Sequence, residues 1–169
     1  MESLQTLIKT YKNSLNKPRF MKRLIKQDKV FFLVAILIIV VDQLTKLVIR
    51  NSFELKESLP VINGFFHLTY IINNGSSFSL IKDQNTILIW ITILILGFIF
   101  YNYNKISDNN ITLVSVALII GGAISNLIDR LIHGGVVDFF DFIIWPVFNV
   151  ADSATTIGAL TLVVYLFKK

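Results

Sequence analysis

The sequence predicts an all-α membrane bundle of four transmembrane helices, with a small β-sheet (a cradle) on its extracytoplasmic side. Three observations lead to this fold class. Hydrophobic residues make up 54% of the 169-residue chain and the mean hydropathy is +0.66, more than one soluble domain of this length needs. The apolar residues gather in four long runs. Between the first two runs, an Asn-Gly pair separates two short segments rich in β-branched and aromatic residues, which is typical of a β-hairpin.

Each of the four apolar runs is long enough to cross a bilayer. A transmembrane helix needs roughly 20 residues, and backbone polar groups in lipid must be satisfied within the segment. The first run is interpreted as a retained span rather than a cleaved signal peptide, because no small-residue cleavage site follows it. The expected spans are Val30–Ile49, Thr86–Tyr103, Ile111–Ile128 and roughly Trp145–Phe167.

The positive charge of the chain is concentrated before the first span. Such an excess marks the cytoplasmic side, so the N-terminus is expected there, and four crossings return the C-terminus to the same side. The connections 50–85 and 130–146 then lie outside. Residues 1–29 are predicted to be a basic cytoplasmic or interfacial extension. Its apolar residues recur at helical spacing, which fits either an interfacial amphipathic helix or a solvated basic tail.

The outer connection after the first span carries the hairpin signal. Leu59–Ile62 and Phe65–Ile72 flank Asn63-Gly64 within an outer-face β region of about residues 53–80. A small sheet there could hold an extended peptide by strand addition, or it could simply cap the bundle. The residues leave both interpretations open.

Composition excludes several kinds of chemistry. Without cysteine the chain has no disulfide, thiol nucleophile or cysteine metal site. Its two histidines, His67 and His133, show no metal-ligand spacing, so neither a metal nor another cofactor is expected. The net charge of +5 is interpreted as a signal of membrane orientation, and no nucleic-acid partner is expected.

Two aspartates near the expected outer membrane boundary are the strongest functional signal. Asp138 stands in VVDFFDF and Asp152 in FNVADSA. Ionisable side chains at membrane depth are costly and usually functional. If the two carboxyl groups meet, they can hold one proton between them, so that one activates water while the other polarises a carbonyl. The alternative for Asp152 is an N-cap of the fourth helix, and Asp141 is interpreted as an exposed interfacial charge.

Asp42 and Lys46 are four residues apart on the first span, so they can form an ion pair on one helix face. A structural pair is the favoured interpretation. The alternative is a serine–lysine protease, with Lys46 as base and Ser76, Ser77 or Ser153 as nucleophile.

The end of the third span carries Asn126, Asp129 and Arg130 on one helix face. Local pairing of Asp129 with Arg130, or contact of Arg130 with lipid phosphate, is favoured over a catalytic role for Asp129. An aspartate beside a guanidinium tends to stay ionised and is a poor proton-sharing partner.

Four stretches, in this order, resemble the lipoprotein signal peptidase (signal peptidase II) family over about residues 30–167. They are Asp42-Gln43-Leu44-Thr45-Lys46; Asn73-Asn74-Gly75-Ser76-Ser77-Phe78; Asn126-Leu127-Ile128-Asp129-Arg130 running into Val136-Val137-Asp138-Phe139; and Phe148-Asn149-Val150-Ala151-Asp152. The chain departs from the family pattern in places. Ser76-Ser77 replaces a small apolar pair, Ser125 stands where glycine is common, and the stretch between the two aspartates is short.

The resemblance implies a bacterial inner-membrane aspartyl endopeptidase, expected to be a monomer, that cleaves the signal peptide of a prolipoprotein just before a diacylglyceryl-modified cysteine. Its partners would be lipid-modified prolipoproteins and membrane lipid. The resemblance makes Asp138 and Asp152 the catalytic dyad. Residues that would orient substrate or dyad are Asn73, Asn126, Arg130 and Asn149, and supporting residues are Asp42, Lys46, Asp129 and Gly75.

Two other classes of protein compete with a hydrolase. A small transporter could use Asp42, Lys46 and Asp129 as a proton relay, but the polar groups gather near one side and no repeat is visible. A purely structural membrane protein would leave Asp138, Asn149 and Asn126 without a shared purpose. A continuous polar path through all helices would favour the transporter.

Overall fold

The computed structural model describes residues 5–6, 18–75, 84–103 and 109–168, with the side chains of 18–28 outside the description. Four helices within the described residues are long and apolar enough to cross a membrane, which confirms the predicted fold class. The helices are α2 (Pro18–Ser52), α3 (Gln84–Tyr101), α4 (Asn110–His133) and α5 (Val150–Phe167), and the strands are β1 (Ser58–Ile62), β2 (Phe66–Asn73) and β3 (Val136–Asp141). The apolar positions of the predicted amphipathic N-terminal segment, and the candidate nucleophiles Ser76 and Ser77, lie outside the described residues.

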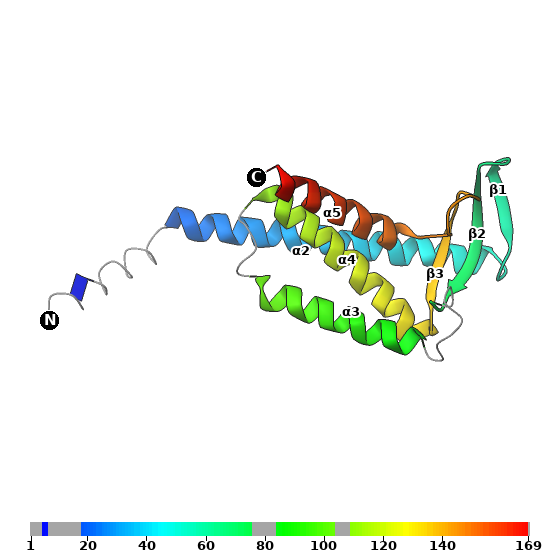
Figure 1. Cartoon of the computed structure of the whole chain (residues 1–169), viewed down its shortest axis with the longest axis horizontal. Coiled ribbons are helices and arrows are strands. Elements are labelled where there is room, and N and C mark those ends of the chain that lie inside the picture. Colours follow the sequence, from blue (N-terminus) through cyan, green and yellow to red (C-terminus); the bar gives the residue numbers. More distant parts are fainter. Residues whose placement is uncertain (1–4, 7–17, 76–83, 104–108, 169) are drawn as a thin grey trace.

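The helices form an elongated bundle with the sheet across one end (Figure 1). Helix α4 packs against α2, α3 and α5, so it is the central helix of the bundle. Helix α2 begins, and α5 ends, at the end of the bundle away from the sheet. Because α2 is continuous from Pro18, the predicted boundary of the basic extension at residue 29 falls within this helix.

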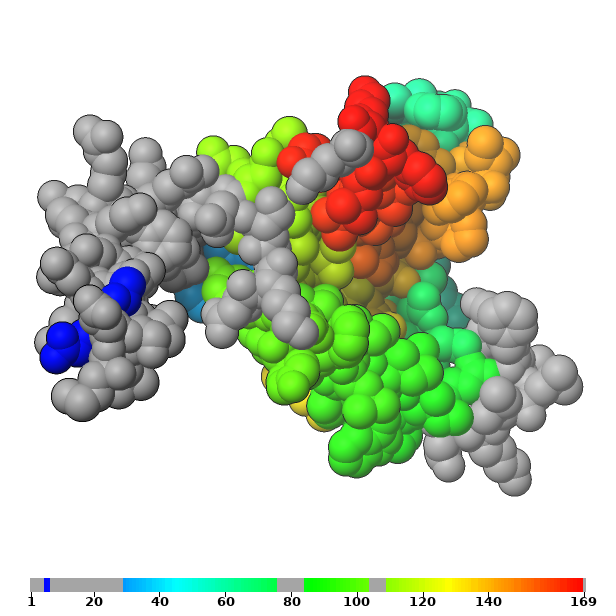
Figure 2. All heavy atoms as spheres, turned by 60° about the vertical axis from the view of Figure 1, so that its left-hand side comes forward, coloured from blue at the N-terminus to red at the C-terminus, as the bar shows by residue number. Residues whose placement is uncertain are grey.

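The outer surface of the bundle is apolar. Trp90, Leu94 and Phe98 on α3 are 61%, 70% and 71% exposed, and α3 and α5 present such side chains on either side of α4 (Figure 2). Exposed apolar side chains on every helix are what lipid-facing surfaces require. A small core between α2, α3 and α4 includes the buried Phe31 and Ile120.

Helix α5 starts at Val150, five residues later than the predicted Trp145. The residues before it pair with the sheet instead: Phe139 and Phe140 donate backbone hydrogen bonds to the carbonyl of Phe148. Pro146 also disfavours a helical conformation of the residue before it. The apolar run therefore divides into a bridge to the sheet and a shorter helix.

The sheet is antiparallel, in the order β1-β2-β3. Its first two strands confirm the predicted hairpin, and Gly64 takes the positive φ of 73° that favours glycine in the turn. Strand β3 was not predicted, because residues 130–146 were treated as a connection. It pairs with β2 and places Asp138 opposite Ile71. The valines before Asp138 and the phenylalanines after it favour a strand, and this signal could have revealed it.

Gly122 allows α4 and α5 to approach closely, and we expect Gly122→Ala to destabilise the protein. A Cβ atom at this position would collide with the Ala151 carbonyl oxygen and with Thr155 Oγ1. Overpacking of this kind costs about 1–3 kcal/mol. Thermal unfolding in detergent should show a lower midpoint than that of the native protein.

Gly97→Ala is the matched control, since nothing lies within 4 Å of a Cβ built at this position on α3. An alanine there should leave the unfolding midpoint unchanged or raise it, because glycine is a poor helix former. Equal midpoints for the two variants would contradict the close α4–α5 contact.

Candidate active site

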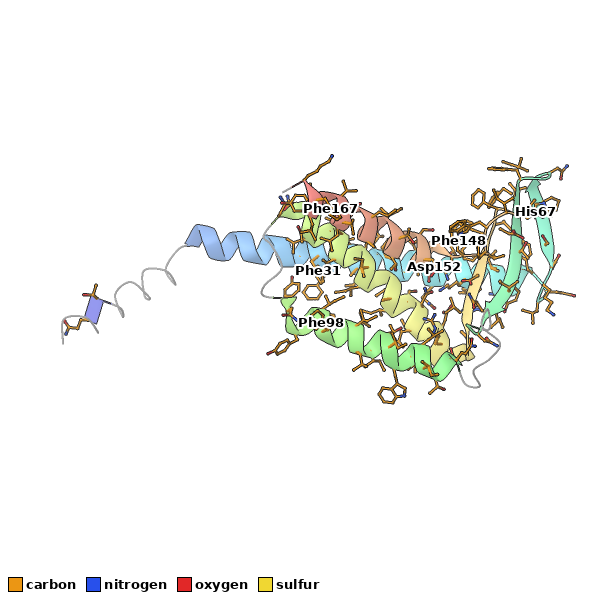
Figure 3. All side chains as sticks on the ribbon, viewed as in Figure 1. Phe31, His67, Phe98, Phe148, Asp152 and Phe167 are labelled. Atoms are coloured by element: carbon orange, nitrogen blue, oxygen red, sulfur yellow. The ribbon has the colours of Figure 1, made fainter. Side chains whose placement is uncertain are left out.

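The two predicted aspartates lie where the sheet meets the helix bundle. Asp138 is on β3 and only 1% exposed, whereas Asp152 is half-buried in the first turn of α5. Figure 3 shows Asp152 and Phe148 at this junction, away from Phe31 and Phe98 at the other end of the bundle. The fold thus brings together two carboxyl groups that are fourteen positions apart.

Asn149 connects these two carboxyl groups. Its Nδ2 donates to Asp138 Oδ1 at 2.7 Å, and its Oδ1 accepts from the backbone N–H of Asp152 at 2.8 Å. Its own backbone N–H donates to Asp152 Oδ2 at 3.3 Å. Asn149 is therefore the N-cap of α5 and Asp152 is the third helical residue of a capping box. The alternative that Asp152 is the N-cap of this helix is therefore wrong, because Asn149 occupies that position.

Two more asparagines donate to the aspartates. Asn73, at the end of β2, donates from Nδ2 to Asp138 Oδ2 at 2.9 Å. Its Oδ1 accepts from the N–H of Gly75, which takes a positive φ of 78° in the following turn. Asn126 on α4 donates from Nδ2 to Asp152 Oδ1 at 2.8 Å. Each carboxyl group therefore accepts two hydrogen bonds. The three asparagines that donate them lie on β2, on α4 and at the start of α5.

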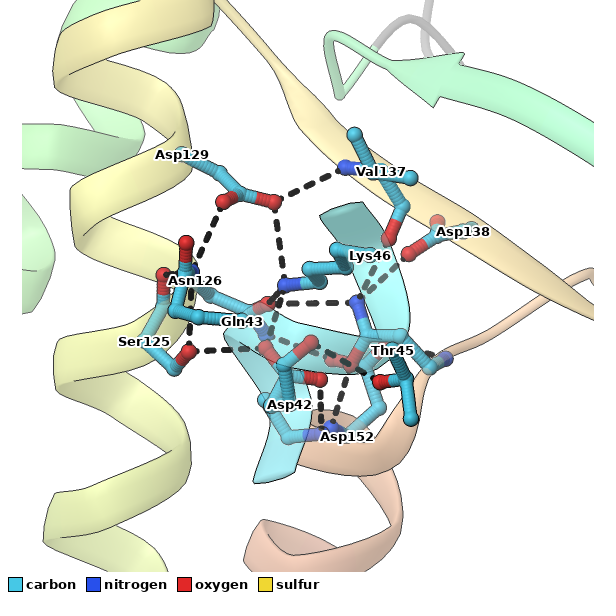
Figure 4. Close-up of polar contacts among 12 residues, drawn as sticks. Asp42, Gln43, Thr45, Lys46, Ser125, Asn126, Asp129, Val137, Asp138 and Asp152 are labelled. Carbon is cyan, nitrogen blue, oxygen red and sulfur yellow. Dashed lines mark hydrogen bonds and ion pairs between the residues drawn. The ribbon is translucent and has the colours of Figure 1, made fainter. Parts of the chain in front are cut away.

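A buried charge cluster lies next to the asparagines (Figure 4). Lys46 forms ion pairs with Asp42 at 2.6 Å and with Asp129 at 3.0 Å, and all three side chains are fully buried. The expected Asp42–Lys46 pair is present. Asp129, expected to pair locally with Arg130, instead pairs with Lys46 and accepts from the N–H of Val137 at 3.0 Å. Helix α4 turns Asp129 toward α2.

Two further polar side chains join this cluster, and neither was among the site residues expected from the sequence. Ser125 Oγ donates to Asp42 Oδ2 at 2.7 Å. Gln43 Nε2 donates to Asp129 Oδ1 at 2.9 Å and to Ser125 Oγ at 3.0 Å. Gln43 lies within the first family motif, and Ser125 directly precedes Asn126. Gln43 is three residues before Lys46, and Ser125 is four residues before Asp129. This helical spacing places each on the same face as a member of the cluster and could have indicated it.

Arg130 lies near the same carboxylates, and among the described residues its side chain makes no hydrogen bond or ion pair with them. Its charge interacts electrostatically with Asp152, Asp138 and Asp129. Among the described residues, its buried Nε has no hydrogen-bond partner, and its backbone carbonyl accepts from Asn85 Nδ2 at 3.2 Å. The guanidinium therefore supplies positive charge near the two aspartates.

Comparison with known proteins identifies this arrangement. Residues 34–168 match the family described as signal peptidase (SPase) II. The chain belongs to the signal peptidase II family. It is 41% identical over 138 residues to the lipoprotein signal peptidase of Halothermothrix orenii, covering 82% of this chain and 95% of that protein. It is 46% identical over 133 residues to that of Moorella thermoacetica, covering 78% and 89%.

A solved structure of a bacterial membrane enzyme has the same fold as this signal peptidase II. It superposes with a TM-score of 0.78 at 34% identity, covering 83% of this chain and 94% of that one. A second bacterial membrane enzyme gives a TM-score of 0.76 at 34% identity, covering 83% and 88%. The family resemblance and the aspartic peptidase class predicted from the motifs are thereby confirmed.

Burial shapes the electrostatics of the signal peptidase II aspartates. Desolvation, and then the negative charge of Asp152, raise the pKa of Asp138 from its ordinary value of 3.8 to about 7. The hydrogen bonds from Asn73 and Asn149 act in the opposite direction. Asp138 can therefore carry a proton near neutral pH, as a proton-sharing pair requires.

The geometry does not support the serine–lysine alternative for the residues that the structure describes. Lys46 bonds to Asp42 and Asp129, whereas Ser153 Oγ donates to the backbone carbonyl of Asn149 at 2.9 Å. Asp141, expected to be an exposed charge, is instead half-buried on the sheet, where it accepts from Thr69 Oγ1 at 2.7 Å. Within the described ranges, no group of three potential metal ligands occurs.

Proposed function

We propose that Asp138 and Asp152 are the catalytic dyad with which this signal peptidase II cleaves a prolipoprotein just before its diacylglyceryl-modified cysteine. The chain is a multi-pass bacterial membrane protein and an aspartic peptidase, and its family members remove signal peptides from prolipoproteins. The observation that carries the assignment is the contact of one buried side chain, Asn149, with both aspartates.

The two aspartates have different surroundings, which suits two different roles. Asp138 has a pKa of about 7 and holds the shared proton. Asp152 accepts from Asn126 Nδ2 and from the Asn149 N–H at the N-terminus of α5, where the helix dipole favours an anion. In this proposal Asp152 takes a proton from the attacking water while Asp138 donates its proton to the scissile carbonyl oxygen.

Peptide binding would follow from the sheet and the nearby donors. Asp138 lies on β3, an edge strand of the sheet, and accepts from Asn73 at the end of the neighbouring β2, so a peptide extended along the β3 edge would reach the dyad. Asn126, Asn149 and Arg130 orient the dyad and substrate, while Asp42, Lys46, Asp129 and Gly75 support them. One copy holds both carboxyl groups, so a monomer suffices, and no cofactor takes part in these steps.

The proposed orientation places this site at the extracytoplasmic face of the inner membrane. The basic residues before Val30 put the start of α2 in the cytoplasm. The sheet and the dyad lie at the other end of the bundle, whereas α5 ends on the side where α2 begins, which is the cytoplasmic side in this proposal. The peptidase domain in this proposal is residues 30–169, in keeping with the family match over residues 34–168.

A lipidated prolipoprotein peptide should be cleaved far better than the same peptide without acyl chains. Each buried CH₂ contributes about 0.8 kcal/mol to membrane attachment, so a diacylglyceryl group concentrates the substrate at the membrane surface. It also fixes the depth of the scissile bond relative to the dyad. The measurement is kcat/KM for both peptides with purified protein in one detergent.

The control for this comparison is a peptide with the same lipid but with the modified cysteine moved several residues along the chain. It should partition equally and be cleaved poorly. Equal kcat/KM for the lipidated and plain peptides would contradict the proposed substrate even if the dyad were correct.

A further inference from the structure

The side chain of Lys46 uses all of its donors inside the protein. An ammonium group has three N–H donors, and here they meet Asp42 Oδ2, Asp129 Oδ2 and Asn126 Oδ1 at 2.6, 3.0 and 2.9 Å. The group is fully buried, so water does not compete for these bonds. Two of the contacts neutralise carboxylates, and the third leads toward the dyad.

The contact with Lys46 determines which way the Asn126 carboxamide faces. Its Oδ1 accepts from Lys46 Nζ and, at 3.1 Å, from Asn149 Nδ2, while its Nδ2 donates to Asp152 Oδ1 at 2.8 Å. Oδ1 can only accept and Nδ2 can only donate. A flipped amide would turn its NH₂ toward the ammonium and its carbonyl toward the Asp152 carboxylate, which creates two repulsive contacts. Within this cluster only one orientation of Asn126 satisfies both neighbours.

The position of Lys46 is itself held from two sides. Asp42 accepts from Ser125 Oγ and, at 2.8 Å, from the N–H of Ala151, which ties it to α4 and α5. Asp129 accepts from Gln43 Nε2 and from the N–H of Val137, which ties it to α2 and β3. The ammonium is thus fixed relative to every element that carries a dyad residue.

We propose that Lys46 is a positioning residue that acts through Asn126: its ammonium fixes the amide so that Nδ2 donates to Asp152 and keeps that carboxylate oriented as the base. This inference rests on the proposed dyad. Among the described residues Lys46 donates no hydrogen bond to Asp138 or Asp152, although its positive charge interacts electrostatically with both. Its hydrogen bonds therefore reach the dyad through Asn126.

The test is a double-mutant cycle of Lys46→Met and Asn126→Ala, measured with a lipidated peptide. Lys46→Met should lower kcat by about 100-fold, the size of effect that misplacing a reacting group causes. KM should stay within about three-fold, because the lysine is not proposed to bind substrate. The acidic limb of the kcat–pH profile should move to higher pH by about one unit, because Asp152 loses both a firmly held donor and the nearby charge of Lys46. In the Asn126→Ala background, where only the charge is lost, Lys46→Met should move this limb less.

The cycle separates positioning through Asn126 from general support of the fold. In the Asn126→Ala background, Lys46→Met should cost no more than about three-fold, since residues acting in one chain are non-additive. Full additivity, or an unmoved acidic limb, would overturn the inference. Thr45→Val is the matched control on the same helix, because among the described residues Thr45 Oγ1 bonds only to the backbone carbonyls of Val41 and Asp42. It should retain native kcat and an unmoved pH profile.

Lys46→Met could fail to fold, because it leaves two buried carboxylates without a cation. In that case the same cycle is run in an Asp129→Asn background, where Lys46→Met leaves one negative charge in the cluster, as in the native protein. Active Asp138→Asn or Asp152→Asn variants would refute the dyad itself. Inactive dyad variants with an additive cycle would refute only the role of Lys46.

Discussion

Asp138→Asn and Asp152→Asn are each expected to lower kcat by about 1,000-fold or more, near the upper range for general acid–base catalysis. An amide at either position can neither hold the shared proton nor remove a proton from water. The two variants should remain folded, because an amide has nearly the same shape as a carboxyl group. Single-turnover cleavage of a lipidated peptide by the purified variants measures the loss.

Asp141→Asn is the control for these substitutions. Asp141 lies on the same strand as Asp138, but its carboxylate accepts from Thr69 Oγ1 and the N–H of Ile143, on the sheet. We expect its kcat to stay within about three-fold of the native value, since it is not placed to transfer protons. Near-native turnover by either dyad variant, or inactivity of Asp141→Asn alone, would show that the dyad is wrongly assigned.

Asn149→Ala is expected to lower kcat by about 100-fold, because the loss of a group that orients both carboxyl groups misplaces the reacting atoms. It removes the donor to Asp138 Oδ1 and the acceptor for the Asp152 N–H. It also removes the N-cap of α5, which costs about 0.5–2 kcal/mol of stability. Kinetics and thermal unfolding should both be measured.

Asn109→Ala separates the two consequences. Asn109 is the N-cap of α4, where its side chain accepts from the N–H of Ile111. It stands seventeen positions before Asn126, which is about 25 Å along a helix. Its alanine variant should lose similar stability and keep native kcat. An equal loss of kcat in both cap variants would mean that Asn149 acts only on the helix.

The sequence was sufficient for the helices and for the pairing of Asp42 with Lys46, because lipid imposes long apolar runs and helical geometry places residues four apart on one face. It was sufficient for the β1–β2 hairpin, because Asn63-Gly64 is a specific turn signal. Strand β3 was missed for a physical reason. Its valines and phenylalanines favour a strand, but its pairing with β2 depends on a contact between residues far apart in the chain, which local patterns do not encode.

The same limit explains the errors within the site. That Asp129 pairs with Lys46 instead of Arg130 depends on how α2 and α4 face each other. That Asn149 caps α5, with Asp152 three positions further into the helix than expected, depends on the backbone bridge of Phe148 to β3. The motifs identified the site residues, whereas their hydrogen-bond and ion-pair partners depend on how the helices and the sheet pack together.

The pH dependence of kcat/KM tests the shared proton most directly, since this quantity reports the ionisation of the free enzyme. Asp138 has a pKa raised from 3.8 to about 7, so it is protonated below that pH and loses its proton above it. If it is the acid of the dyad, kcat/KM should fall as the pH rises, with a descending limb at about 7. The free energy of unfolding should also decrease as the pH rises from 3.8 to about 7, because over this range Asp138 is ionised in the unfolded chain but keeps its proton in the folded protein. A kcat/KM that stays level or rises from pH 6 to about 8.5 would contradict a protonated Asp138 as the catalytic acid.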